Sequence, residues 1–153
     1  MSDISVIARH AVTVLAGQLA VMAFGVTDTI VAGRFSADAL AALSVASAVF
    51  VSVYVSLMGV LQALLPVWAE QHGRGETAAI GQSFRQSLYL AAAASVLGMG
   101  VLLFPEPLLR LTEVPDAMRE SVRDYLIIVG WALPSALFFR LYTTLNQALG
   151  RPQ

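Results

Sequence analysis

One carboxylate lies inside an otherwise apolar stretch near the start of the chain, and its position there suggests chemistry. The stretch runs from Ala11 to Gly33, and Asp28 is its one charged residue. As a helix it would be about 34 Å long, enough to cross a hydrocarbon core of about 30 Å. An acid at that depth costs at least ~2.5 kcal/mol and is by default a functional-site hypothesis. We therefore take Asp28 as a candidate cation-binding residue.

Small side chains share the predicted helix face of Asp28. Gly17 and Gly25 lie on this face with Phe24, and Gln18 lies on its border. They leave room beside the carboxylate for another helix, an ion or a ligand. The nearby helix end carries the negative end of the helix dipole, which favours binding of a proton or cation. The alternative is that Asp28 reaches water at the lipid headgroups and has no role.

The composition is that of an integral membrane protein. Of the 153 residues, 58% are hydrophobic and 12% are charged, whereas about a quarter are charged in soluble domains. The absence of cysteine excludes disulfides, thiolate metal sites and cysteine nucleophiles. The net charge of -1 offers no basic stripe for nucleic acid. The first apolar run is too long for a signal peptide, so we interpret it as a retained transmembrane helix.

The hydropathy pattern predicts an all-α membrane protein with four transmembrane helices. They are expected at about residues 6–33, 39–69, 84–104 and 125–148. At residues 70–82 we expect a hydrophilic loop, with the alternative that it begins as a helix lying at the interface, and at residues 106–124 a loop with a short interfacial helix. Four spans place both termini on the same side of the membrane. The segments expected on the two sides of the membrane carry equal numbers of arginines, so the arginine distribution does not decide the orientation of the protein in the membrane.

Prolines and small residues predict where these helices bend and pack. Pro66 is expected to kink or end the second helix, and Pro134 is expected to kink the fourth. In the third helix, Ala94 and Gly98 belong to a small-residue pattern that lets helix backbones approach closely. Arg140 in the fourth helix either extends to the membrane interface or pairs with an acid of another helix.

Enzyme motifs are absent from the sequence. It contains no histidine pair on a helix, no glycine-rich phosphate loop and no nucleophile with an identifiable base. His72 has no second histidine at metal-ligand spacing. We therefore expect neither an enzyme nor a metal site.

Four stretches of the chain, taken in order, carry a family resemblance. They are GQLAVMAFGVTDTIVAGRFSADALAALSVAS, MGVLQALLPVWAEQHGRGE, FRQSLYLA and YLIIVGWALPSALFFRLYTTLNQALGRP. They resemble the first helix and turn, the end of the second helix with its loop, and the third and fourth helices of multidrug and toxin extrusion (MATE) transporters. In the second stretch, a proline precedes an Ala-Gln-x-x-Gly pattern that ends here at Gly73. The resemblance covers essentially the whole chain.

The resemblance implies an antiporter that expels drugs and organic cations in exchange for protons or sodium ions. The family has about twelve helices in two lobes of six, so residues 1–153 would be the four-helix N-terminal portion of the first lobe. Asp28 matches the first-helix acid that is protonated or binds a cation, and Gln18, Phe24 and Tyr54 are candidate cavity residues. No cofactor beyond the coupling ion, H⁺ or Na⁺, is implied.

The implied setting is a multi-pass protein of the cell membrane, namely the inner membrane of a bacterium. Its partners would be the lipid bilayer, the exported compounds and the missing transporter helices. Pro66, Gly73 and Pro134 are candidate structural positions.

The chain departs from the family pattern at several positions. Thr13 and Val21 replace a proline and a second glutamine that are common in the first helix. Glu70 replaces the loop glutamine, and Thr143 replaces a frequent fourth-helix arginine. These differences leave open whether the first helix bends at a proline and how polar the cavity is.

Three hypotheses about the working unit follow from the sequence. The chain is the first third of a longer exporter, or a membrane fragment or assembly partner that does not transport. The third hypothesis is a four-helix exporter that works as a dimer.

Overall fold

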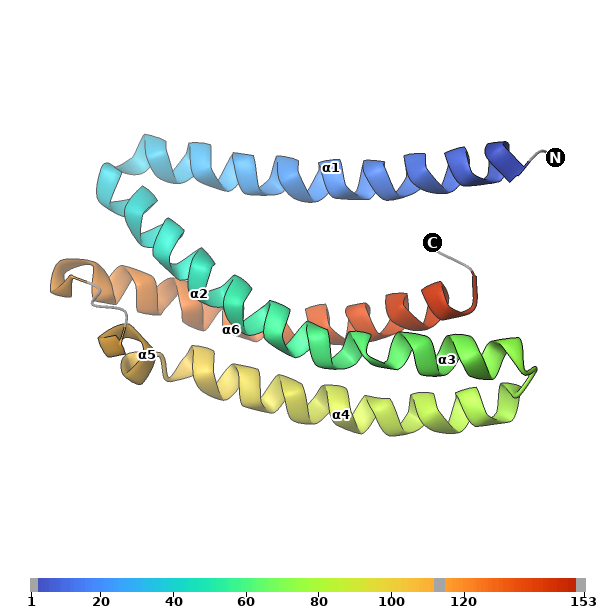
Figure 1. Cartoon of the computed structure of the whole chain (residues 1–153). Helices are drawn as coiled ribbons and strands as arrows, with labels where there is room; N and C mark the ends of the chain where they lie inside the picture. The colour runs from blue at the N-terminus through green and yellow to red at the C-terminus, as the bar shows by residue number, and fades with distance from the viewer. Residues whose placement is uncertain (1–2, 112–114, 151–153) are drawn as a thin grey trace.

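The computed structural model describes residues 3–111 and 115–150, and every element in these ranges is a helix (Figure 1). The helices are α1 (Asp3–Phe35), α2 (Ala37–Gln62), α3 (Leu64–Gly73), α4 (Thr77–Leu103), α5 (Glu106–Leu111) and α6 (Asp116–Ala148). Four stretches within them are long and apolar enough to cross a membrane. One of these stretches, Ala37–Gly73, comprises both α2 and α3. The predicted all-α membrane architecture is confirmed.

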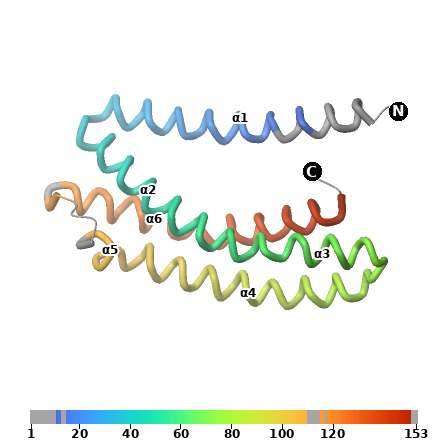
Figure 2. The backbone as a smooth tube through the Cα atoms, in the orientation of Figure 1, coloured from blue at the N-terminus to red at the C-terminus, as the bar shows by residue number. Residues whose placement is uncertain are grey.

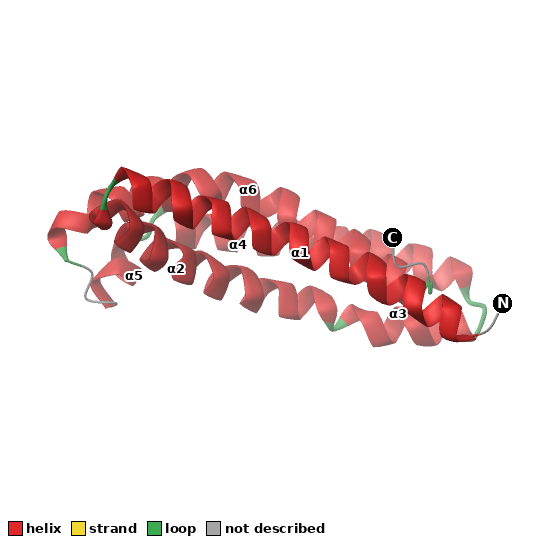
Figure 3. Ribbon diagram, turned by 90° about the horizontal axis from the view of Figure 1, so that it is seen from above, coloured by secondary structure: helices red, strands yellow, loops and turns green. Residues whose placement is uncertain are grey.

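The helices α2, α3, α4 and α6 form a bundle, and α1 lies apart from it along much of its length (Figure 2). The turn at Ser36 joins α1 to α2, and the Ser36 hydroxyl accepts a hydrogen bond from the Ala39 amide at 3.0 Å. Seen from above, α1 runs along the length of the bundle (Figure 3). The start of α1 and the end of α6 lie at the same end of the molecule, as the even number of spans predicted (Figure 1).

The helix α6 packs against both α2 and α4 through one continuous face. Its buried residues recur at intervals of four, four and three: Val122, Leu126, Gly130, Leu133, Leu137, Leu141, Thr144 and Ala148. Such an 11-residue repeat corresponds to about 3.67 residues per turn, close to the 3.6 of an α-helix. The buried face therefore stays on one side of α6 over its whole length.

The helix α4 meets this face with small side chains. Ala91, Ala94 and Gly98 are all buried. A Cβ atom added at Gly98 would clash with the Leu133 side chain of α6 and would lie 2.6 Å from Cδ1 of Leu57 of α2. The predicted close approach of helix backbones therefore occurs where α2, α4 and α6 meet.

The second span is interrupted near Pro66, but the break lies upstream of the proline. The helix α2 ends at Gln62, Ala63 forms a turn, and α3 resumes with Pro66 as its third residue. Proline has no N–H for the carbonyl four residues earlier, which is that of Gln62, and its ring crowds that carbonyl. The interruption therefore falls at Ala63, while Pro66 is tolerated in the first turn of α3.

The loop predicted at residues 70–82 is wrong in extent, because the structure has helix on both sides of a short turn. The helix α3 continues to Gly73 and α4 starts at Thr77, seven residues before the predicted start at 84. The positive φ of 73° in this turn belongs to Gly75. An ion pair of 2.6 Å between Glu70 and Arg74 lies on the exposed end of the span. The polar sequence therefore marks the ends of long helices, not a loop.

The start of the fourth span also differs from the prediction. The helix α6 begins at Asp116, and the charged segment before Tyr125 is part of it. Val122 and Leu126 are fully buried there, so this amphipathic segment packs against the bundle. Within the predicted loop region of residues 106–124, the short helix α5 is a separate element, and the residues from Asp116 onward belong to α6. The helix continues through Pro134, which is half-buried.

Gly98→Leu should lower the free energy of unfolding by about 1–3 kcal/mol, because the added atoms would overfill the junction of three helices. Gly100→Leu is the matched control, since a Cβ there meets nothing within 4 Å. Thermal unfolding in detergent would compare them. Equal midpoints for the two variants would contradict this packing.

Candidate functional site

Asp28 lies on the one face of α1 that is turned toward the bundle. Between Leu15 and Phe35, the half-buried residues of α1 are Asp28 and Ala32, which lie one turn apart, and the others are exposed. The i, i+4 spacing places both on the same side of the helix. The carboxylate is therefore at the junction between α1 and the rest of the structure.

This junction contains a pocket of about 400 Å³ between α1, α2 and α6. Its lining residues are Asp28, Val31, Ala32 and Phe35 of α1, Ala39, Ala42 and Leu43 of α2, and Ser121 and Tyr125 of α6. Asp28 is the one charged group among them, and the two residues of α6 bring hydroxyls. Pockets for small organic ligands have this size and this mostly apolar lining with a few polar groups.

The Asp28 carboxylate has no hydrogen bond or ion pair within the part of the chain that the structure describes. The hydroxyls of the flanking Thr27 and Thr29 donate instead to the carbonyl oxygens of Ala23 and Gly25, at 2.8 and 2.9 Å. An unpaired carboxylate in a mostly apolar pocket is a candidate site for a cation.

The other predicted cavity residues do not line this pocket. Gln18 is exposed and Phe24 is 71% exposed, both on the open length of α1. Tyr54 is half-buried in α2 and stacks on Phe50, with ring centroids 6.0 Å apart.

Sequence reasoning missed Ser121 and Tyr125, which line the same pocket as Asp28. A signal for them was present, because alternating spans place the end of the first helix and the start of the fourth at the same membrane face. The choice among residues at that face depends on how the helices pack.

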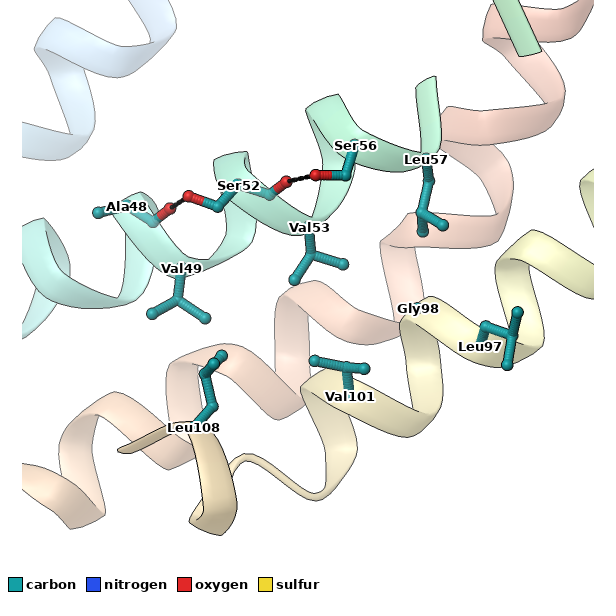
Figure 4. Close-up of a pocket in the computed structure, with 10 residues that line it drawn as sticks. All are labelled: Ala48, Val49, Ser52, Val53, Ser56, Leu57, Leu97, Gly98, Val101 and Leu108. Atoms are coloured by element: carbon teal, nitrogen blue, oxygen red, sulfur yellow. Dashed lines mark hydrogen bonds between the residues drawn. The ribbon is translucent and has the colours of Figure 1, made fainter. Parts of the chain in front are cut away.

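A second pocket, of about 500 Å³, lies between α2 and α4 and extends to Leu108 of α5 (Figure 4). Its serines are Ser52 and Ser56, whose hydroxyls donate to the carbonyl oxygens of Ala48 and Ser52 at 2.8 and 2.7 Å. Because these hydroxyls are used within α2, the pocket offers an apolar surface and no group for chemistry.

The residues that the structure describes contain no cluster of side chains suited to bind a metal ion. No group of three or more His, Cys, Asp or Glu residues there is arranged to hold a metal ion.

Comparison with known proteins identifies relatives along nearly the whole chain. The MatE family model matches residues 14–153. A probable multidrug resistance protein NorM from Aromatoleum aromaticum is 39% identical over 145 residues, covering 95% of this chain and 31% of the relative. For NorM from Neisseria meningitidis serogroup B the identity is 28% over 155 residues, covering 100% of this chain and 34% of the relative.

A third relative is the multidrug resistance protein MdtK from Pectobacterium atrosepticum, which is 35% identical over 133 residues, covering 86% of this chain and 29% of the relative. The chain thus spans about a third of the length of these curated relatives. No solved structure matches it.

The pocket can be tested by thiol labelling, because the chain has no cysteine of its own. A lipophilic cation should slow labelling of Ser121→Cys several-fold, since the bound cation would cover this pocket residue. Ser44→Cys, exposed on α2 outside the pocket, is the control and should be labelled at an unchanged rate. Protection that persists after Asp28→Asn would contradict cation binding at the carboxylate.

Proposed function

Because the chain belongs to the multidrug and toxin extrusion (MATE) family, whose members are multi-pass membrane transporters and not enzymes, we propose that it forms part of an exporter of drugs and organic cations. Relatives named as multidrug resistance proteins support this proposal. Four helices able to cross a membrane support it as well.

We propose further that export is coupled to the entry of protons or sodium ions through Asp28. The observation that carries this proposal is the unpaired carboxylate in the pocket between α1, α2 and α6. A drug cation and the coupling ion would compete for the one negative charge there. Ser121 and Tyr125 line the same pocket, and their hydroxyls would help to hold either ion.

Occupancy of Asp28 would change how α1 packs against the bundle. The span Leu15–Phe35 is otherwise exposed, and its bundle-facing side centres on Asp28 and Ala32. A neutralised carboxylate can approach the apolar residues of α2 more closely than a charged one, because burying a charge is costly. Binding of the coupling ion would therefore favour the position of α1 that is closer to α2. It would also favour release of the drug cation, so the two binding events would be coupled through two states of α1.

The four helices are proposed to need partners for transport. Large apolar side chains along α1 are exposed, among them Val21, Met22 and Phe24 at 70%, 67% and 71%. Further transporter helices or a second copy of the chain would cover this surface, and lipid alone would cover it in a fragment that does not transport.

The coupling role can be tested in membrane vesicles that contain the product of the native gene. Asp28→Asn should reduce efflux of a lipophilic dye cation at least about tenfold, because the pocket lining then has no carboxylate to exchange the cation for the coupling ion. Asp38→Asn is the matched control and should transport normally, since Asp38 is exposed in the first turn of α2.

Normal efflux by Asp28→Asn would show that coupling occurs elsewhere. Failure of the unsubstituted product to transport any dye cation would overturn the exporter proposal itself. Asp28→Glu keeps the charge, so partial activity of this variant would separate loss of the carboxylate from loss of folding.

A further inference from the structure

The charged side chain of Arg140 in α6 also lies within a membrane span, and the proposed coupling makes no use of it. It belongs to the span Met118–Ala148 and lies about 12 Å from the end of that helix. Its Nη2 donates a hydrogen bond to Oε1 of Gln62 at 2.6 Å. Its Nε is buried and has no hydrogen-bond partner within the described ranges. The positive charge therefore faces a neutral amide and no anion.

The guanidinium is held away from the nearer membrane surface. Side chains on a helix tilt toward its N-terminus, whereas the interface nearest to Arg140 lies at the C-terminal end of α6. The hydrogen bond to Gln62, the last residue of α2, ties the side chain to the neighbouring helix. Extension to the interface, one of the two sequence-based alternatives, is therefore disfavoured.

Asp28 is too distant to neutralise Arg140. The pocket of Asp28 is lined by Tyr125, which lies about 22 Å along α6 from Arg140 at ~1.5 Å per residue. The two charges thus lie at different depths, toward opposite faces of the membrane. Asp28 and Arg140 therefore cannot neutralise each other, and each would need a different counter-ion.

The neighbouring groups leave the guanidinium donors available. The hydroxyls of Thr143 and Thr144 donate to the backbone carbonyl of Arg140 at 2.8 and 2.9 Å, so they are occupied within α6. Arginine has five N–H donors in a planar fork, and Gln62 accepts from one of its nitrogens. Arg140 is half-buried, and its buried Nε still lacks an acceptor among the described residues. A carboxylate matches this geometry, because it can accept two parallel hydrogen bonds.

We propose that Arg140, oriented by Gln62, is a carboxylate-binding site inside the membrane, at a different depth from the cation site at Asp28. The carboxylate comes either from an exported compound or from an acidic side chain on a transporter helix outside these residues. Binding itself requires no transport activity, whereas an exported carboxylate as the ligand rests on the proposed function.

The probes for this site are pyrenebutyrate and its methyl ester, which differ in the carboxylate and contain no cation for Asp28. Binding to the chain in detergent micelles would be followed by energy transfer from its two tryptophans. The acid should bind at least about tenfold more tightly than the ester, because charge-assisted hydrogen bonds form with the acid alone. Arg140→Gln should abolish this preference, and Gln62→Leu should weaken it.

Two further variants separate the site from a general effect of charge or folding. Arg123→Gln should keep the full preference, because Arg123 is an exposed arginine outside the site, 3.5 Å from Glu106. Arg140→Lys keeps the charge without the planar fork, so its preference should be intermediate. Equal binding of acid and ester by the unsubstituted chain, or a preference that survives Arg140→Gln, would overturn the proposal.

The source of the carboxylate can be identified with the product of the native gene. If the acid preference persists there, the site is open to an exported carboxylate compound. If the preference is lost there and Arg140→Gln lowers the thermal midpoint while Arg140→Lys does not, an acid of another helix already fills the site. Loss of the preference without any change in the thermal midpoint would count against the site. None of these readings depends on efflux through Asp28.

Discussion

The arrangement of the helices depends on the burial of one continuous face of α6. In a bilayer, apolar burial alone does not hold helices together, because lipid tails are as apolar as leucine. Close packing provides the contact instead, and Gly98 allows it by letting Leu133 and Leu57 converge on one point of α4. This constraint fixes α2, α4 and α6 relative to one another and leaves α1 outside the tight bundle.

The loose attachment of α1 gives the position of Asp28 its significance. A charge buried in the tightly packed bundle would have one fixed environment. The environment of a charge at the junction of α1 with α2 and α6 instead depends on which ion or molecule occupies the pocket. Arg140 represents the opposite case, because it is tied to the bundle by Gln62 and its surroundings are fixed. The chain thus combines an acidic side chain at a loosely packed junction with a basic side chain on the packed bundle, at separate membrane depths.

Much of this could be predicted from the sequence. Hydropathy located the four spans, and a single acid in an apolar run made Asp28 the candidate site residue. Element boundaries were less predictable, because the spans are longer than the membrane is thick and their exposed ends carry loop-like residues, as at Thr77 and Asp116. Ser121 and Gln62 were not identified as site residues, because their contacts depend on which helix faces meet. No local pattern encodes that choice.

The central claim is that Asp28 binds the exported cation and the coupling ion in turn. Its most direct test is the affinity of the native-gene product for a lipophilic dye cation, measured at rising proton and, separately, rising sodium concentrations. The account predicts that one of the two ions weakens dye binding in the unsubstituted protein and that neither does so after Asp28→Asn. An unchanged ion dependence in Asp28→Asn would contradict the account, because the competition would then take place at another group.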